Sequence, residues 1–260
     1  MTRLDVWLAE HGLAESRQQA QALVMLGRVR IDGRPATKPG TTVREASKVA
    51  VEPGPAHVGR GALKLEGALD AFGVDPSGRV AVDVGASTGG FTETLLARGA
   101  ARVYAVDVGR GQLHERLRAD PRVVVRDRTN ARALSPADVP EPCSLATVDV
   151  SFISVEKILP ALRTVLAPGA EAVVLVKPQF EVGRGQVGRG GIVKDPALHR
   201  EALRAVAASA QALGYAPRDA CASPVAGAEG NREFFLLLAR DGEPLGADAL
   251  EERLGKAAAP

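Results

Sequence analysis

The sequence has 260 residues, of which 45% are hydrophobic and 25% charged, and its net charge is +2. This is enough apolar material for one full core and a second, smaller domain, so we expect a soluble globular protein. The longest wholly apolar runs, such as Phe234 to Ala239, are far shorter than the roughly 18 residues of a membrane helix, so we expect no membrane span.

The N-terminus carries charges every few residues and lacks the apolar segment of a signal peptide, which favours a cytoplasmic protein. Cys143 and Cys221 stand outside any paired-cysteine spacing, and the four histidines are scattered along the chain. We therefore expect neither a disulfide nor a bound metal, and we expect a monomer.

Residues 1–51 have the pattern of a small α+β domain. Apolar residues recur with helical spacing in two stretches, the second of which ends at Gly27. Val29 and Ile31 then alternate with charged residues before an Asp-Gly turn, and residues 49–51 suggest a closing strand. The pattern predicts two short helices followed by a small sheet.

The basic excess of the chain belongs to its first quarter. Residues 1–60 carry nine Lys/Arg against six Asp/Glu, whereas the remaining residues are almost neutral. Arginines along one edge of the domain would hold RNA phosphates by charge without reading bases, and a solvated basic face is the alternative. The predicted RNA-binding residues in this part are Arg3, Arg17, Arg28, Arg30, Arg34 and Arg60.

The pattern of this domain is more specific than its charge. An Arg-Leu-Asp start, Ser-Arg at the second helix and a Gly-x-Val-x-Ile-Asp-Gly strand and turn lie between Arg3 and Gly33. These motifs resemble the small RNA-binding domain first described in ribosomal protein S-four. The resemblance implies a phosphate-binding role for the arginines.

The following segments divide into a linker, a larger domain and a tail. Residues 52–61 hold two prolines and three glycines, which is typical of a linker. Residues 62–245 alternate β-rich apolar runs with amphipathic stretches, which predicts a parallel sheet covered by helices with a final antiparallel pair. Residues 246–260 suggest a short helix that frays, and we assign this tail no role. The predicted strands are 80–84, 102–106, 123–125, 145–150 and 171–176, then one from 215 and one at 233–239.

The turn in "AVDVGASTGGFT" has the features of a nucleoside-binding turn. Gly85, Gly89 and Gly90 are spaced G-x-x-x-G-G, whereas a dinucleotide cradle needs G-x-G-x-x-G. Asp107 follows Gly85 by 22 residues, close to the separation of about 20 at which an acid meets a ribose hydroxyl. A nucleoside without pyrophosphate indicates S-adenosylmethionine, whose positive sulfonium also tolerates Asp83. A purely structural strand-to-helix turn is the alternative.

The next predicted strand end, "RDRTNAR", adds two polar candidates. Asp127 could accept from the adenine amino group with Asn130 nearby, although both residue types are also common turn formers. The predicted cofactor-binding residues are Asp83, Gly85, Ser87, Thr88, Gly89, Gly90, Phe91, Asp107, Asp127 and Asn130.

Four charged residues fall beside predicted strands, in "GALKL", "ATVDVSFIS", "VLVKPQFE" and "NREFFLLL". Ions at such places are desolvated unless they are paired, so they indicate either catalysis or a structural ion-pair network. The four candidates are Lys64, Asp149, Lys177 and Glu233.

The order Lys, Asp, Lys, Glu, with "DVGASTGGFT", "VDVSFIS" and "VKPQFE", resembles the FtsJ-type ribose 2′-O-methyltransferases. Together with the N-terminal domain, residues 1–240 are similar to the TlyA family of bacterial rRNA methyltransferases, also called hemolysin A. The resemblance implies a Rossmann-like class I methyltransferase sheet with helices on both faces and catalysis by the four charged residues. It also implies methylation of cytidine 2′-hydroxyls in small-subunit rRNA, large-subunit rRNA or both, with ribosomal subunits as partners.

The chain departs from this family just before Lys64. Relatives often have an aromatic residue followed by Val-Ser-Arg-Gly-Gly, whereas this chain reads "HVGRGALKL". The difference puts the coupling between the two domains in doubt.

The candidate residues suggest a mechanism. A ribose hydroxyl is a poor nucleophile until its proton is removed, and the methyl group must lie in line with it. We hypothesise that Lys177 accepts this proton and is held by Asp149 and Glu233. Lys64 would offset the carboxylates and orient the hydroxyl.

Two further features have both functional and ordinary readings. Phe152 and Phe180 follow the predicted catalytic strands, where core packing is the expected role and stacking on an extruded cytosine the alternative. Residues 181–196 are rich in glycine, contain the RNA-binding candidates Arg184 and Arg189, and lack the ending of a phosphate loop. We predict a basic flap that orders on RNA binding, with an ordinary flexible loop as the alternative.

Three other functions are consistent with parts of the sequence. A membrane-active hemolysin is weakened by the absence of a predicted span, signal or amphipathic surface helix. A non-catalytic RNA-binding or ribosome assembly protein is weakened by the complete set of four charged residues. A nicotinamide oxidoreductase is disfavoured by the glycine spacing.

Overall fold

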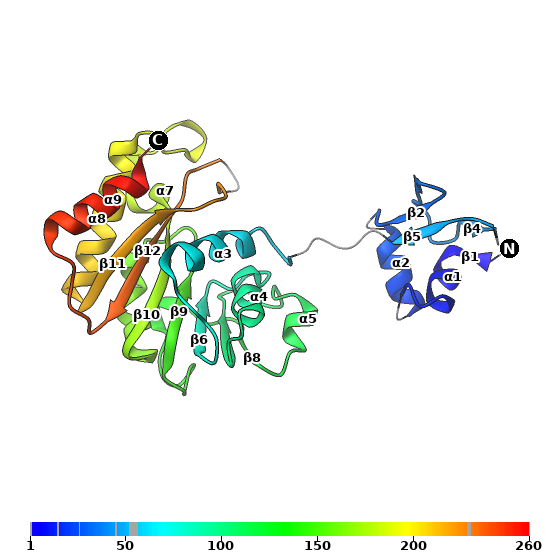
Figure 1. Ribbon diagram of the computed structural model, residues 1–260, viewed down its shortest axis with the longest axis horizontal. Coiled ribbons are helices and arrows are strands. Elements are labelled where there is room, and N and C mark those ends of the chain that lie inside the picture. Colours follow the sequence, from blue (N-terminus) through cyan, green and yellow to red (C-terminus); the bar gives the residue numbers. More distant parts are fainter. Residues whose placement is uncertain are drawn as a thin grey trace. The chain divides into compact units, whose positions relative to one another are not determined.

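The computed structural model describes residues 2–14, 16–25, 27–44, 46–51, 57–227 and 230–259, without the side chains of residues 22 and 184. The chain forms two compact units, Met1–Ala56 and His57–Pro260 (Figure 1). Residues 52–56 of the predicted linker and the side chain of the RNA-binding candidate Arg184 lie outside the described part.

The N-terminal unit packs two helices against each other beside short antiparallel strands. Leu4, Leu8 and Val24 from the helices share one core with Val29, and each is at most 1% exposed. The helical and alternating patterns of the sequence are thus confirmed, because each presents one apolar face to this core. The elements are β1 (Thr2–Arg3) paired with β4 (Thr42–Val43), α1 (Leu4–Glu10), α2 (Arg17–Met25), and β2 (Val29–Ile31) between β3 (Arg34–Pro35) and β5 (Val49–Val51).

The second unit is built on a sheet that, within the described residues, has the strand order β11-β12-β10-β9-β6-β7-β8. The strands from β10 to β8 are parallel, and β12 is antiparallel to both β10 and β11. The predicted parallel sheet with a closing antiparallel pair is confirmed. The strands are β6 (Val80–Val84), β7 (Arg102–Val106), β8 (Val123–Arg126), β9 (Cys143–Val148), β10 (Leu166–Val176), β11 (Tyr215–Ala222) and β12 (Phe234–Arg240).

Helices cover both faces of this sheet, because the strand residues alternate between two apolar cores. Along β10, Val174 and Val176 belong to one core, whereas Val173 and Leu175 belong to the other. The first core is closed by α6 (Leu159–Val165), α8 (Pro196–Ala212) and α9 (Ala247–Ala258), and the second by α3 (Gly61–Phe72), α4 (Gly90–Ala97) and α5 (Glu115–Arg118) (Figure 1). The one-turn helix α7 (Pro178–Glu181) follows β10.

The C-terminal segment is docked on the sheet, so the prediction that it frays is wrong. Leu250 and Leu254 of α9 lie in the first core, and Arg253 forms an ion pair with Asp219 of β11 at 2.6 Å. The apolar residues of α9 recur at helical spacing and form a stripe that packs against α8 and β11. This packing stabilises a helix that would be marginal alone.

Candidate functional site

The four predicted catalytic residues meet at one edge of the sheet. Lys64 lies in the first turn of α3, Asp149 follows β9 and Lys177 follows β10. Glu233 precedes β12, whose antiparallel direction brings its start to the edge where the parallel strands end. All four residues line one cavity of about 560 Å³, which we call the tetrad cavity.

The tetrad consists of two ion pairs. Lys64 Nζ lies 2.5 Å from Glu233 Oε2, and Lys177 Nζ lies 2.6 Å from Asp149 Oδ1. Both lysines and Glu233 are at most 9% exposed, so each charge depends on its partner. The structure therefore pairs Glu233 with Lys64, whereas the sequence hypothesis holds Lys177 with both carboxylates.

Ser151 is a member of the site that the sequence reasoning missed. Its hydroxyl oxygen accepts a hydrogen bond from Lys177 Nζ at 2.8 Å, and Ser151 lines the tetrad cavity. The only signal for this role is its position two residues after Asp149. Lys177 thus contacts two oxygens, and the remaining position on its nitrogen is left for a ligand.

A second cavity of about 600 Å³ adjoins the tetrad cavity and shares Ser87 and Asp149 with it. Of the predicted cofactor residues, Gly85, Asp107 and Asn130 also line this second cavity, which we call the nucleoside cavity. Thr88 lines a smaller recess of about 140 Å³ beside both. The carboxyl ends of neighbouring strands thus form a joint site, as expected for an open α/β sheet.

Asp107 is held in place by the backbone of the two loops that meet at the nucleoside cavity. Its Oδ2 accepts from the Ser87 N–H at 2.8 Å, and its Oδ1 accepts from the Gly109 N–H at 2.7 Å. Each oxygen keeps further acceptor capacity, which suits the hydroxyl pair of a ribose. Gly85 and Asp107 thus line the same cavity, and the contact of Asp107 with a ribose stays a prediction.

Most of the nucleoside cavity's remaining walls were missed because their residue types carry no special signal. Apolar side chains there resemble ordinary core positions until the fold leaves them at a cavity. The missed lining residues include Val108, Gln112, Thr129, Arg132, Ile153 and Ile158.

Two predicted cofactor-binding residues have other partners in the structure. Asp83 is fully buried beneath the turn, where its carboxylate accepts from the hydroxyls of Thr92 at 2.7 Å and Thr147 at 2.9 Å. Burial raises the pKa of Asp83 to about 6, although both hydroxyl donors oppose this shift. Asp127 pairs with Arg118 at 2.6 Å, which lowers its pKa, and it does not line the nucleoside cavity. Asp83 therefore braces the turn, and Asp127 anchors a neighbouring loop.

The glycines of the turn are required by close packing. Gly85 has a φ of +87°, and a Cβ there would collide with the carbonyl oxygen of Asp149. A Cβ on Gly89 would collide with Leu117, and one on Gly90 would lie 2.8 Å from the Ala62 nitrogen. Gly89 and Gly90 thus let α4 pack against α5 and α3. Phe91 belongs to the same core, with its ring centroid 6.1 Å from that of Phe235.

Phe152 is exposed at the junction of the two cavities, so the expectation of core packing is wrong for this residue. Its exposed fraction is 92%, and its φ of +64° is unusual for an aromatic residue. The ring centroids of Phe152 and Phe180 are 5.3 Å apart, and both side chains line the tetrad cavity. Two aromatic faces therefore border the space in front of the lysines.

Two of the predicted RNA-binding arginines of the N-terminal unit bind one buried carboxylate. Arg3 donates to both oxygens of Asp5 at 3.1 Å, Arg17 donates to Oδ2 at 3.0 Å, and their side chains are 53% and 57% exposed. Arg34 is exposed, and Arg28 and Arg30 are half-buried. Arg3 and Arg17 are thus fixed in orientation while part of each guanidinium faces solvent.

Two further RNA-binding candidates lie in the second unit. Arg60 lines the tetrad cavity directly before α3. Arg189 is exposed in the glycine-rich loop whose residues Val187 and Gly191 line the same cavity. Arg60 therefore lies beside the tetrad, whereas Arg189 belongs to a loop that borders the same cavity.

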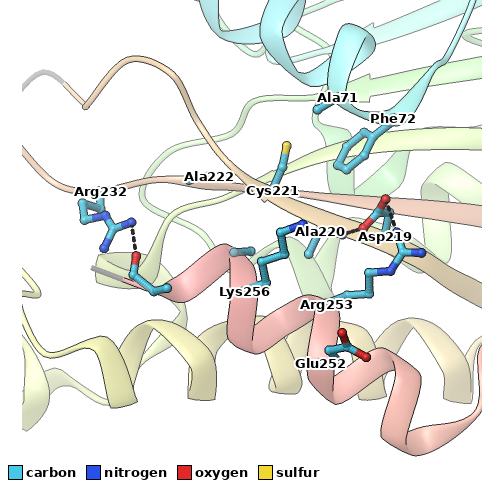
Figure 2. A pocket seen from close by; sticks show the side chains of 12 residues that line it. Ala71, Phe72, Asp219, Ala220, Cys221, Ala222, Arg232, Glu252, Arg253 and Lys256 are labelled. Atoms are coloured by element: carbon cyan, nitrogen blue, oxygen red, sulfur yellow. Dashed lines mark hydrogen bonds and ion pairs between the residues drawn. The ribbon is translucent and has the colours of Figure 1, made fainter.

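A larger cavity, of about 670 Å³, lies between α3, the edge strand β11 and α9 (Figure 2). Figure 2 shows Arg253 directed at Asp219. Arg232 donates to the carbonyl of Ala259 at 2.6 Å. No tetrad residue lines this cavity. Its described charges are largely engaged in holding α9 to the sheet.

Comparisons with known proteins agree with this division into two units. Residues 57–240 match the FtsJ-like methyltransferase family, and residues 2–49 match the S4 domain. A Mycobacterium tuberculosis protein named 16S/23S rRNA (cytidine-2′-O)-methyltransferase TlyA is 51% identical over 258 residues, which cover 98% of this chain and 96% of the relative.

A second relative and a solved structure carry the other name of this group. Hemolysin A of Brachyspira hyodysenteriae is 37% identical and aligns over 90% of this chain and 98% of its own. A solved structure of a hemolysin candidate from Streptococcus thermophilus has a TM-score of 0.74 at 40% identity, covering 98% of this chain and 95% of that chain. In the described ranges of the present chain, no helix is both long and apolar enough to cross a membrane. The same ranges contain no group of three or more His, Cys, Asp or Glu side chains placed to hold a metal ion.

Proposed function

Because this chain belongs to the TlyA family within the FtsJ-like methyltransferases, we propose that it transfers a methyl group from S-adenosylmethionine to cytidine ribose 2′-hydroxyls in rRNA. The observation that carries this proposal is the junction of the two cavities. Asp149 and Ser87 line both the nucleoside cavity and the tetrad cavity, so a methyl donor in one lies beside the reacting group in the other.

The polar residues that line the nucleoside cavity support S-adenosylmethionine as its ligand. Asp107 would accept from the ribose hydroxyls, and Asn130 offers an amide near the position of the base. The Asp149 carboxylate at the shared wall would favour a positive sulfonium centre. When bound, S-adenosylmethionine supplies an electrophilic methyl group at that centre.

Within the tetrad, Lys177 accepts the proton of the ribose 2′-hydroxyl while the 2′-oxygen forms its new bond to the methyl carbon. The methyl donor would keep the electron pair of the broken carbon–sulfur bond, so the charges of the transfer balance. Asp149 and Ser151 then stabilise the resulting ammonium at 2.6 and 2.8 Å. Lys64 orients the hydroxyl and is itself held by Glu233.

Phe152 supports a role in holding the target nucleotide outside the RNA helix. Its exposed ring at the cavity junction offers a face on which an extruded cytosine stacks, and Phe180 borders the same space. The strained backbone of Phe152 is consistent with this role, because such strain persists mainly where function requires it.

The N-terminal unit supplies RNA affinity that does not depend on base sequence. Arg3 and Arg17 are fixed by Asp5 in an orientation that allows charge-assisted hydrogen bonds to phosphates. The name of the M. tuberculosis relative supports rRNA of both subunits as substrate. Action on ribosomal subunits also implies a cytoplasmic enzyme.

The experiment that tests this function uses purified protein, isolated 30S and 50S subunits and S-adenosylmethionine labelled in its methyl group. We expect label on a cytidine ribose in each subunit and its loss with Lys177→Ala at saturating substrate. Absence of transfer to either subunit would reject rRNA methylation as proposed. Full activity of Lys177→Ala would reject Lys177 as the proton acceptor and leave the reaction itself supported.

A further inference from the structure

The three residues directly before β12, Asn231 to Glu233, each form hydrogen bonds with a different part of the second unit. Glu233 binds Lys64 of α3 at 2.5 Å, and Arg232 donates to the carbonyl of Ala259 at the end of α9 at 2.6 Å (Figure 2). Asn231 holds the glycine-rich loop, through contacts to Gly191 and Val193. Of these three residues, Asn231 is the one that contacts a loop of the tetrad cavity and takes no part in the proposed reaction.

Asn231 uses both ends of its amide on this one loop. Its Nδ2 donates to the Gly191 carbonyl at 2.9 Å, and its Oδ1 accepts from the Val193 N–H at 2.9 Å. Asn231 is 1% exposed, and its own carbonyl accepts from the Gly227 N–H at 2.9 Å. A buried amide with matched partners is costly to disturb, because any lost hydrogen bond leaves a desolvated polar group.

A second buried side chain holds the same point of the loop from the opposite element. His199 of α8 donates from Nε2 to the Val193 carbonyl at 2.9 Å, and it is 1% exposed. Its ring centroid lies 5.1 Å from that of Phe234, which fixes the imidazole against the sheet. Both backbone groups of Val193 are thus bonded to buried side chains, and Val193 itself is 2% exposed.

The fixed point determines the position of one wall of the tetrad cavity. Gly191 lines this cavity and is bonded directly to Asn231, and Val187 lines it further along the loop. The Gly188 N–H donates to the Ile192 carbonyl at 3.1 Å, so the stretch between these residues is a closed turn. Val187 also lines a neighbouring cavity of about 450 Å³ together with Phe152 and Phe180.

We propose that Asn231, together with His199, is a positioning residue that holds residues 187–193 as a preset wall for the RNA nucleotide entering the tetrad cavity. The loop predicted to be a flap is, on this account, anchored at its C-terminal half before RNA arrives. The proposal rests on the proposed function, since the wall matters only if RNA enters this cavity. Because neither Gly191 nor Val187 lines the nucleoside cavity, the effect falls on RNA more than on S-adenosylmethionine.

The test compares Asn231→Ala with Arg232→Gln, a matched change in the next residue that loosens α9 and leaves the loop contacts intact. Hydrogen exchange is measured on peptides spanning 183–195 and 250–259, and methylation kinetics are measured on the isolated subunits. We expect Asn231→Ala to raise exchange of the loop amides roughly tenfold or more and to raise the KM for the RNA substrate roughly tenfold, with a smaller fall in kcat. Arg232→Gln should instead raise exchange at 250–259.

Two milder variants test the same contacts with less risk that the protein misfolds. Asn231→Asp keeps the acceptor for the Val193 N–H and loses the donor to Gly191, so it should fall between wild type and Asn231→Ala. His199→Phe keeps a ring against Phe234 and removes the bond to Val193, so it should loosen the loop without loss of the sheet's protection. If Asn231→Ala loses protection throughout β6 and β10, these two variants decide the outcome.

The proposal is overturned if loop exchange is unchanged in these variants, or if exchange rises while the KM and kcat for RNA stay at wild-type values. Failure of wild type itself to methylate either subunit would reject the proposed function instead. The two failures are distinguishable, because the first appears only in the comparison of variants and the second in the unaltered protein.

Discussion

Asp5 in the N-terminal unit and Asp83 in the methyltransferase unit are both fully buried, yet burial has opposite results for the two carboxyl groups. Hydrogen bonds from Arg3, Gln21 and Arg17 hold the pKa of Asp5 far below its usual range, against the effect of burial. Asp83 is bonded by neutral donors, among them the hydroxyls of Thr92 and Thr147, and burial raises its pKa to about 6. The neighbours of a buried acid thus decide whether its charge is stabilised.

The contrast extends to what each unit does with its cations. Around Asp5 the acid is buried and the arginines are about half exposed, so the positive charge faces outward. In the tetrad both lysines and Glu233 are buried and Asp149 is partly buried, so the charge is confined to a cavity. The first arrangement suits binding of phosphates by charge, and the second suits proton transfer at one position.

The largest expected effect is on the rate of methylation, through the lysines of the tetrad. Lys64→Met should lower methylation of ribosomal subunits by about 10²- to 10⁴-fold, because Glu233 is left as an unpaired buried charge and the hydroxyl loses its orienting cation. Initial rates with labelled methyl donor measure the loss, and filter binding should show RNA affinity changed only several-fold. Lys256→Met, at an exposed position in α9, is the matched control and should keep the wild-type rate. Equal losses in both variants would contradict a specific role for Lys64.

The second effect is a pH dependence of the free energy of unfolding that comes from Asp83. Between pH 4 and 6 the folded protein keeps a proton on Asp83 that the unfolded chain has lost, so stability should fall as pH rises through this window. A pKa near 6 against an unfolded value of 3.8 corresponds to about 3 kcal/mol. Asp83→Asn removes this titration, so its free energy of unfolding should gain on wild type from pH 4 to 7. Urea unfolding at several pH values measures the difference, and a constant difference would show that Asp83 is not the titrating group.

Asp5 should show the opposite sign and a smaller change. Because its pKa is lowered on folding, its stabilisation is full above pH 4 and is lost as the pH falls. Asp5→Asn should therefore lower the urea midpoint at pH 7 and approach wild type at acid pH. The change is reduced by solvent screening of the half-exposed arginines. A deficit that grows toward low pH would refute this account of Asp5.

The smallest effect concerns the exposed arginines. Arg17→Gln should weaken RNA binding several-fold and reduce the slope of log affinity against log salt concentration by about 0.7 to 0.9, as expected for one lost phosphate contact. The value of kcat should stay unchanged, because Arg17 lies in the other unit. Binding measured at three or more salt concentrations decides this, and an unchanged slope would exclude a phosphate contact at Arg17.

Much of this protein could be inferred from residue order alone. The spacing of apolar residues predicts which side of an element is apolar, as in Val173 to Val176 and in α9. This spacing is a local property of the chain. The charged residues that follow β9 and β10 could be assigned to one edge, because parallel strands end together. The separation between Gly85 and Asp107 likewise indicated that they lie close together, since turn and acid end neighbouring strands that line one cavity.

Only the tertiary structure decided which of these residues touch. Lys64 and Glu233 are 169 positions apart, and their pairing depends on how α3 crosses the start of β12. Tertiary structure likewise determines that Asp83 is buried beneath the turn and that Phe152 is exposed in the loop after β9. It also brings Asn231 to partners that lie 38 and 40 positions away. A residue pattern encodes the preference of a side chain for burial, whereas contact depends on packing between elements that are distant in sequence.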